Sequence, residues 1–116
     1  LTGMASGNAV ENWTSTRDCG SFLSQVYAGT LVSKNASERM MQLLLGQTRR
    51  TKIPAGVPSG VKVANKTGEL AAVQNDVAIV FGTHPYVLAV MSSDISSAVA
   101  PSQITELSRA VWDAAQ

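Results

Sequence analysis

Hydrophobic side chains in the first half of the chain recur at helical spacing. In one segment they lie three and four residues apart, at Cys19, Phe22, Leu23, Val26 and Tyr27. This spacing places them in one stripe along an α-helix, for which Thr16 is a suitable N-cap and Gly29 a suitable end. Residues 1–15 are rich in Gly, Ser, Asn and Thr and lack such periodicity, so we expect a loop there.

A second amphipathic pattern follows. Its apolar face consists of Met40, Met41, Leu44 and Leu45. Ser37 stands where an N-cap is expected, and Gly46 stands where a helix would stop. The pattern predicts a second helix, so that residues 16–46 are helical, with the methionines in the core.

Turn-forming residues then interrupt the helical pattern. Between Arg49 and Gly60 they are Pro54, Gly56, Pro58, Ser59 and Gly60. Such a run predicts an extended loop rather than a regular element. A tight basic cluster lies at its start, and we expect its side chains to be solvated: Arg49, Arg50 and Lys52.

Residues 60–94 carry the pattern of β-strands. Val61 and Val63 begin a first strand that runs toward Gly68. Two apolar, β-branched runs follow, Asp76 to Phe81 and Tyr86 to Met91. The four residues between these runs predict an antiparallel hairpin, and the nearly continuous apolar character of both runs predicts burial on both faces of the sheet.

A last helix is predicted over residues 101–116. Pro101 or Ser102 opens it, and the apolar positions are Ile104, Leu107, Val111 and Ala114. The order of helix, helix, three strands and helix differs from βαβ alternation. It predicts an α+β fold in which an antiparallel sheet of three strands packs with helices, all within one domain over residues 1–116. Because so small a sheet is incompletely covered, we expect one sheet edge to require a partner.

Composition narrows the possible functions. A chain of 116 residues with 45% hydrophobic and 15% charged residues suits one compact domain. A net charge of +1 does not provide the basic surface that nucleic-acid binding requires. With a single cysteine, Cys19, and a single histidine, His84, the chain has no internal disulfide and no Cys/His metal site. The uncharged run from Val77 to Ser93 is broken by a turn sequence, which argues against a membrane span.

One short motif carries a physical mechanism. Lys66, Thr67 and Gly68 stand at the end of a predicted strand. An ammonium and a hydroxyl can hold a carboxylate, and glycine allows a ligand to approach the strand edge closely. The tripeptide alone is equally compatible with an exposed turn.

A longer stretch changes this balance. The sequence from Ile53 to Leu70 resembles the segment that leads through the Lys-Thr-Gly box of class A β-lactamases and penicillin-binding relatives. Further similarities follow in the same order, at Thr14–Thr16, Gly29–Ser33, Ser37–Met41 and Asn75–Asp76. The resemblance covers Thr14 to Gln116. It implies part of a β-lactamase/transpeptidase-like fold, its C-terminal portion.

The resemblance also implies a reaction and roles for four residues. The reaction is acyl transfer through a serine, on β-lactams or peptidoglycan-like peptides, without cofactor or metal. Lys66 would hold the substrate carboxylate and shift the proton affinity of its neighbours, while Thr67 would donate its hydroxyl to that carboxylate. Gly68 would permit close approach, and the backbone N–H of Glu69 would be one of two oxyanion donors.

The sequence departs from the family pattern where the nucleophile is concerned. A Ser-x-x-Lys string occurs at Ser59 to Lys62, but it lies in the Pro/Gly-rich loop rather than at a helix start, and a Ser-Asp-Asn box is absent. We therefore expect the chain to be the C-terminal part of a serine hydrolase and to be inactive alone. The nucleophile is expected in an N-terminal part that would also pair with the edge of the last strand, unless a second copy does so.

Two further departures concern carboxylates. Glu69 stands where a small residue is common, and its charge would repel an anionic substrate unless the side chain points to solvent. In the family's β-lactamases a glutamate, with an asparagine four residues after it, serves deacylation. This pair has no counterpart here, since Ser15 stands four residues after Glu11. A D,D-peptidase or penicillin-binding relative with slow or no β-lactam hydrolysis, and a non-catalytic binding remnant, are therefore alternatives.

The other candidate residues favour structural roles. We expect His84 to be an exposed turn residue, Cys19 to be buried packing, and Trp13 and Trp112 to anchor the first loop and the last helix. The Asn-x-Ser/Thr strings at Asn12, Asn35 and Asn65 are expected to be chance occurrences. The resemblance places the protein outside the cell or in the bacterial envelope, in β-lactam catabolism and antibiotic resistance.

Overall fold

The chain folds into three helices and a three-stranded sheet in a computed structural model that describes residues 2–4 and 11–116. The helices are α1 (Thr16–Ala28), α2 (Lys34–Leu45) and α3 (Ala100–Ala115), and a 3-10 turn, η1, spans Ile53–Gly56. The sheet contains β3 (Lys62–Leu70), β4 (Val73–Phe81) and β5 (Tyr86–Val90). A short separate pair joins β1 (Thr2–Met4) to β2 (Glu11–Trp13). The predicted α+β class, with helices packed on an antiparallel sheet, is confirmed.

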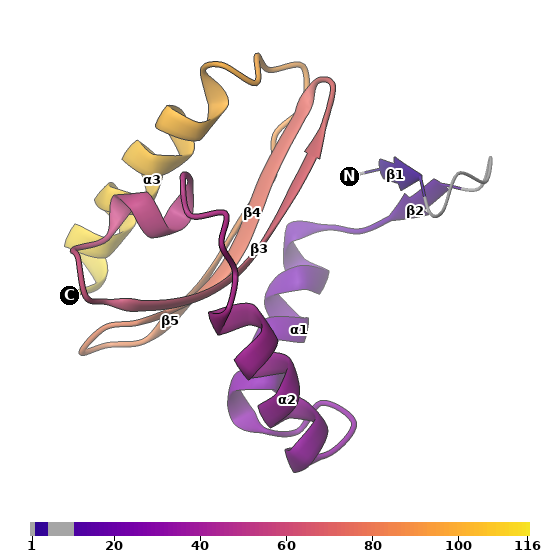
Figure 1. Cartoon of the computed structure of the whole chain (residues 1–116), viewed down its shortest axis with the longest axis vertical. Helices are drawn as coiled ribbons and strands as arrows, with labels where there is room; N and C mark the ends of the chain where they lie inside the picture. Colours follow the sequence, from indigo (N-terminus) through magenta and orange to yellow (C-terminus); the bar gives the residue numbers. More distant parts are fainter. Residues whose placement is uncertain (1, 5–10) are drawn as a thin grey trace.

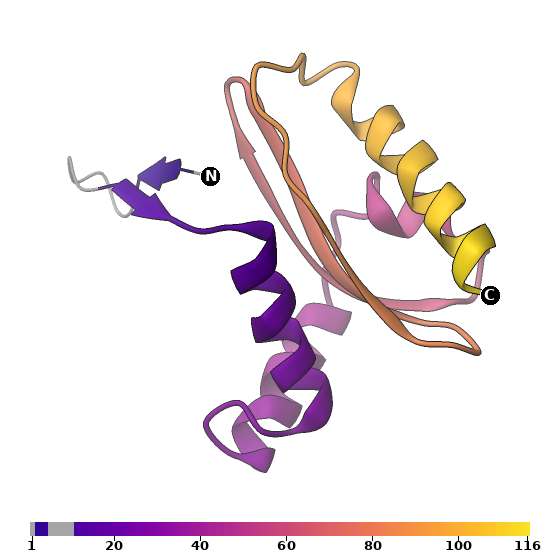
Figure 2. The ribbon, with the colours of Figure 1, turned by 180° about the vertical axis from the view of Figure 1, so that it is seen from behind.

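The sheet lies between two helical layers. Its strands follow the order β3-β4-β5 and are antiparallel, with Thr67 opposite Asp76 and Ile79 opposite Val87. Helix α3 and η1 cover one face, while α1 and α2 lie against the other face toward one end of the sheet (Figures 1 and 2). The hairpin predicted between the last two strands is confirmed.

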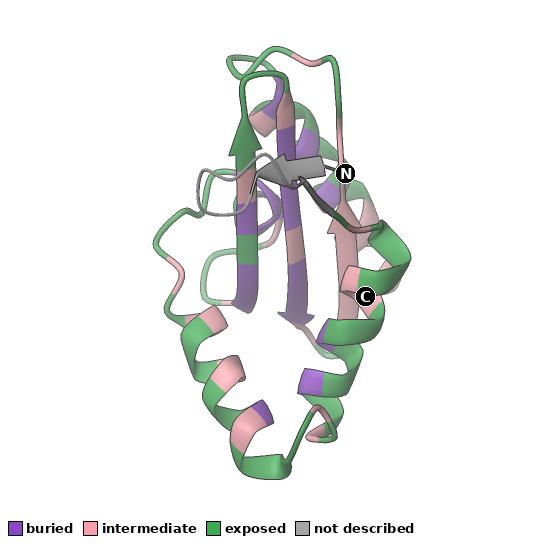
Figure 3. Cartoon of the chain, turned by 90° about the vertical axis from the view of Figure 1, so that its right-hand side faces the viewer, coloured by how far each residue is buried: buried purple, intermediate pink, exposed green. Residues whose placement is uncertain are grey.

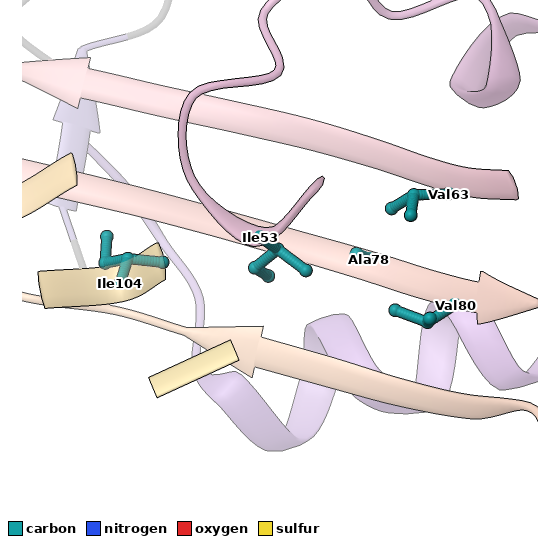
Figure 4. Close-up of a cluster of buried hydrophobic side chains, with 5 residues drawn as sticks. All are labelled: Ile53, Val63, Ala78, Val80 and Ile104. Atoms are coloured by element: carbon teal, nitrogen blue, oxygen red, sulfur yellow. The ribbon is translucent and has the colours of Figure 1, made fainter. Parts of the chain in front are cut away.

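Each face of the sheet carries its own apolar core. On the α3 face, the buried side chains are Ile53, Val63, Ala78, Val80 and Ile104 (Figure 4). On the other face, Leu23 and Val26 of α1 pack against Ala64 and Ile79. Neighbouring residues of β3 and β4 thus serve opposite faces, as the alternation of a strand requires. The predicted burial holds for β4, where six of nine residues are buried, whereas β5, for which the same was predicted, is half-buried throughout (Figure 3).

Both predicted N-caps lie at the wrong residue. Helix α1 is capped by Ser15, whose Oγ accepts a hydrogen bond from the Asp18 N–H at 3.0 Å. Helix α2 is capped by Ser33, whose Oγ accepts from the Ala36 N–H at 3.0 Å. Ser37 is instead buried one turn inside α2, where its hydroxyl donates to the Leu31 carbonyl at 2.8 Å. The predicted ends at Gly29 and Gly46 are confirmed, and Gly29 has the left-handed φ of 76° that glycine adopts readily.

Three expectations about connecting segments are also wrong. Residues 2–4 and 11–13 form strands rather than a loop. Residues 1 and 5–10 lie outside the described part of the chain. The Pro/Gly-rich loop contains η1, because Pro54 at its first turn suits helical backbone and Ile53 is drawn into the core. Trp13 anchors nothing in the described residues, since it is 72% exposed, whereas Trp112 does pack against the α3-side core.

Strand β5 forms one edge of the sheet in the described residues. It pairs with β4 alone, and all five of its residues are half-buried. Its N–H and C=O groups on the outer side have the arrangement that accepts another strand. That an N-terminal part or a second copy fills this edge stays a prediction.

Candidate functional site

The Lys-Thr-Gly box, residues 66–68, lies within β3 and not in a turn. Strand alternation divides its side chains between the two faces. Lys66 shares the α1 face with Cys19 and Phe22 and lines, with them, a cavity of about 400 Å³. Thr67 is buried on the opposite face, beside Glu69. Because these two side chains lie on opposite faces, they can contact the same ligand only if that ligand lies at the outer edge of β3.

The outer edge of β3 is open. Among the described residues β3 pairs only with β4, and carbonyls on its other side accept from side chains. Arg50 donates to the Val63 carbonyl at 3.5 Å, and the Lys66 ammonium donates to the Thr67 carbonyl. Because backbone direction repeats every second residue of a strand, the Glu69 N–H points to the same open edge.

Gly68 leaves room beside the strand. A Cβ built at this position would meet only the Asn75 side chain, at 3.8 and 3.9 Å. These are ordinary contact distances, so packing within the described residues does not itself demand glycine. The surroundings of Gly68 therefore leave space in which a ligand could lie against the strand.

The carboxylate of Glu69 pairs with a buried lysine, while its side chain stays 31% exposed. Its Oε1 accepts from the Lys52 ammonium at 2.9 Å, and its Oε2 pairs with Arg49 at 3.4 Å. The Lys52 ammonium also donates to the Asn75 carbonyl at 3.0 Å. Although partial burial acts to raise it, the pKa of Glu69 is lowered by hydrogen bonds from Lys52 and Thr67 and by the charges of Lys52 and Arg49.

Lys52 corrects the expectation of a solvated basic cluster. Its side chain is only 3% exposed, whereas that of Arg49 is 68% exposed. Burial of Ile53 in the core carries the adjacent lysine inward, and Glu69 with the Asn75 carbonyl compensates its charge. Lys52 is thus a site residue that the sequence analysis missed. In the sequence, only the glutamate at position 69 of a predicted strand indicated that a cation would lie nearby to compensate its charge.

Behind the ion pair lies a buried polar network around Asp76. Its carboxylate accepts from the Ile53 N–H at 2.9 Å and from the Asn65 amide at 3.1 Å. Asn65 also donates to the Arg49 carbonyl at 3.2 Å. Burial raises the pKa of Asp76, against the opposing effect of these hydrogen bonds and of Lys52. The network ties the segment containing Arg49, Lys52 and η1 to β3 and β4, and so holds the surroundings of Glu69 in place.

The remaining candidates lie away from the box or lack a catalytic arrangement. Ser59 is exposed in the turn before β3, with Lys62 on the strand, so the pair does not sit on a helix start. His84 lies in the exposed hairpin turn, whose backbone is held by the Gln116 side chain. Cys19 is half-buried, with its Sγ 3.4 Å from the Thr14 hydroxyl. Asn65 is fully buried.

The described part of the chain offers neither a metal-binding cluster nor a membrane-spanning helix. Residues 2–4 and 11–116 contain no cluster of three or more His, Cys, Asp or Glu side chains able to hold a metal ion. None of the helices in these residues combines the length and apolar character needed to span a membrane.

Comparison with known proteins identifies the family. The model of the β-lactamase enzyme family matches residues 1–115. The chain therefore belongs to the β-lactamase enzyme family. No curated protein matches the chain significantly.

Solved structures agree with this assignment. PBP-A is 27% identical, with a TM-score of 0.81 over 87% of this chain and 39% of that chain. A β-lactamase from Sphaerobacter thermophilus DSM 20745 is 25% identical, with a TM-score of 0.86 over 92% of this chain and 42% of that chain. An ancestral class A β-lactamase, at 22% identity and a TM-score of 0.75, shares the fold. The chain thus spans well under half the length of these structures.

Proposed function

We propose that this chain forms the Lys-Thr-Gly wall of a serine acyl-transfer site in a β-lactamase-like hydrolase that acts on β-lactams or peptidoglycan-like peptides. The observation that carries the proposal is the outer edge of β3, which no strand of the described residues pairs with and where the Lys66 ammonium and the Glu69 N–H lie. Family membership supports it. A mutant of PBP-A has been solved as an acyl-enzyme complex with penicillin G, which supports this substrate class.

In this proposal the chain supplies binding and electrostatic groups rather than the nucleophile. A serine from a Ser-x-x-Lys segment outside these 116 residues attacks the substrate carbonyl, and its acyl-enzyme is later released by water or an amine. The Glu69 N–H donates to the carbonyl oxygen as negative charge develops there. Lys66, extended along the open edge, binds the substrate carboxylate, while Gly68 leaves room for the substrate backbone.

The second candidate is a D,D-peptidase or penicillin-binding relative that releases its acyl group slowly. One observation favours it, namely that no glutamate in the sequence is followed four residues later by asparagine. In either case the same groups on β3 bind the substrate. We further propose export to the cell envelope or the extracellular space, where peptidoglycan-like substrates occur.

Replacing Lys66 by alanine tests the proposed role of the box. In a protein that carries this chain together with a Ser-x-x-Lys segment, Lys66→Ala should reduce the acylation rate constant for penicillin G by about 10- to 150-fold. This is the effect of losing one charge-assisted hydrogen bond, worth about 1.5–3 kcal/mol. The measurement is stopped-flow acylation with a fluorescent penicillin.

Lys62→Ala is the matched control for this experiment. Lys62 is an exposed lysine at the start of the same strand, four residues before the box. Its replacement removes the same charge and should leave the rate constant within about twofold, the range of a surface substitution. Equal rates for Lys66→Ala and the parent protein would make the box purely structural.

A further inference from the structure

Three donors surround the Glu69 carboxylate beside the box. The Lys52 ammonium lies 2.9 Å from Oε1, the Arg49 guanidinium lies 3.4 Å from Oε2, and the Thr67 hydroxyl, on the same face of β3, helps to lower the pKa of the same carboxylate. A buried ammonium, a guanidinium and a hydroxyl make a complete binding site for a carboxylate. In this chain a carboxylate of the chain itself fills that site.

The Lys52–Glu69 contact differs from a surface ion pair, although Arg49 is exposed and Glu69 is partly exposed. Lys52 is nearly inaccessible, with a side chain 3% exposed, and its ammonium is held by the Asn75 carbonyl as well as by Glu69. Thr67 is likewise buried. A ligand carboxylate approaching the outer edge of β3 would therefore meet the negative charge of Glu69, and it could reach Lys52 or Thr67 only by displacing that side chain.

We propose that Glu69 is an internal carboxylate that occupies the anion subsite formed by Lys52, Arg49 and Thr67, and that it sets the ligand preference of the box. This inference rests on the proposed function and names the substrate class of the same site. Ligands that present a neutral or cationic group to Glu69 are preferred, and ligands that present a carboxylate there are disfavoured. The lowered pKa of Glu69 is consistent with a carboxylate that stays ionised and in place at neutral pH.

A purely structural role of Glu69 would have different consequences. If Glu69 serves only to fasten the segment containing Arg49 and Lys52 to β3, its removal lowers stability and creates no anion site. If it fills a subsite, its removal exposes donors that then bind an added carboxylate. Anion binding after removal of Glu69 therefore separates the two roles.

The first experiment uses acetate as the probe on the full 116-residue chain. Amide chemical shifts of residues 66–69 and of Lys52 are followed during titration with sodium acetate, with sodium chloride at equal ionic strength as the reference. Glu69→Ala should bind acetate saturably and at least about tenfold more tightly than the parent chain, the effect of about one hydrogen bond to a charged group. Glu106→Ala, at an exposed glutamate on α3, should behave like the parent chain.

An acetate affinity equal in the parent chain and in Glu69→Ala would overturn the inference. If the alanine variant loses the dispersed amide signals of the sheet, Glu69→Gln is measured in its place. Glutamine keeps the volume and removes the charge, so tighter acetate binding is expected again. Unchanged binding in that variant would equally overturn the inference.

The second experiment separates this inference from the proposed function. In a protein that also carries a Ser-x-x-Lys segment, acylation by penicillin G is compared with acylation by its uncharged methyl ester. Glu69→Ala should raise the acid-to-ester ratio of acylation rate constants about tenfold. Acylation with an unchanged ratio would refute the role of Glu69 while the proposed function stands. Absence of acylation by either compound would refute the proposed function, and the acetate titration would still decide the role of Glu69.

Discussion

Replacement of Asp76 by alanine should destabilise the chain by about 3–5 kcal/mol. The carboxylate is fully buried and accepts from the Ile53 N–H and the Asn65 amide, so its removal leaves the Ile53 N–H and one N–H of the Asn65 amide unpaired. It also removes a negative charge that compensates the buried Lys52 ammonium. The free energy of unfolding from urea titration, compared at equal m-value, gives the result directly.

Asp113→Ala is the matched control for the Asp76 variant. Asp113 is exposed on α3, so its loss should change the free energy of unfolding by less than about 0.5 kcal/mol. If Asp76→Ala lowered the free energy of unfolding by no more than this amount, the network would not be what holds η1 against the sheet. In that event the position of Lys52 beside Glu69 would need another explanation.

The second large effect is expected from Gly56→Ala, at about 2–3 kcal/mol of destabilisation. A Cβ at position 56 would come within 2.5 Å of the Thr105 carbonyl oxygen and of the Ser108 Cβ on α3. One of these atoms belongs to the helix backbone, so relief requires η1 and α3 to move apart. Thermal or urea unfolding of the two chains measures the cost.

Gly20→Ala provides the opposite case within the same chain. Gly20 lies inside α1, and a Cβ there would meet no atom within 4 Å beyond its own turn of helix. Because alanine favours helix over glycine, this variant should gain about 0.5–1 kcal/mol. Equal effects of the two substitutions would contradict the close approach of η1 to α3.

The regular elements were predictable because their signals are local. Apolar spacing located the helices, and β-branched runs around Gly82–Pro85 located the hairpin, since these patterns follow from periodicity alone. The helix starts were less predictable because each has two suitable cap residues. Ser15 precedes Thr16, and Ser33 precedes Ser37, and only the packing of each helix decides which hydroxyl meets the free N–H groups.

The box was predictable from sequence, but its surroundings were not. Residues 66–69 are contiguous, so a motif can reveal them. The Lys52–Glu69 ion pair joins residues 17 positions apart, and it forms because Ile53 enters the core beside β3. A basic cluster in a Pro/Gly-rich loop is normally solvated, and nothing local distinguishes Lys52 from Arg49. Tertiary packing alone separates the buried lysine from its exposed neighbour.

The Thr67 side chain illustrates the same limit. Adjacent residues of a strand point to opposite faces, so Lys66 and Thr67 do not present their groups side by side. The structure places the Thr67 hydroxyl with Glu69 and leaves Lys66 at the outer edge. The resemblance implies that Thr67 binds a substrate carboxylate, and for this the Thr67 hydroxyl must first leave the Glu69 carboxylate.

Mapping of a penicillin adduct tests the central proposal most directly. The 116-residue chain, and a protein that carries it together with a Ser-x-x-Lys segment, are each incubated with penicillin G, and then analysed by intact mass and peptide mapping. The account predicts no adduct on the chain alone, and in the longer protein a single adduct on the serine of the added segment. An adduct on Ser59, or on any other residue of the 116, would contradict it, as would a longer folded protein that is never acylated.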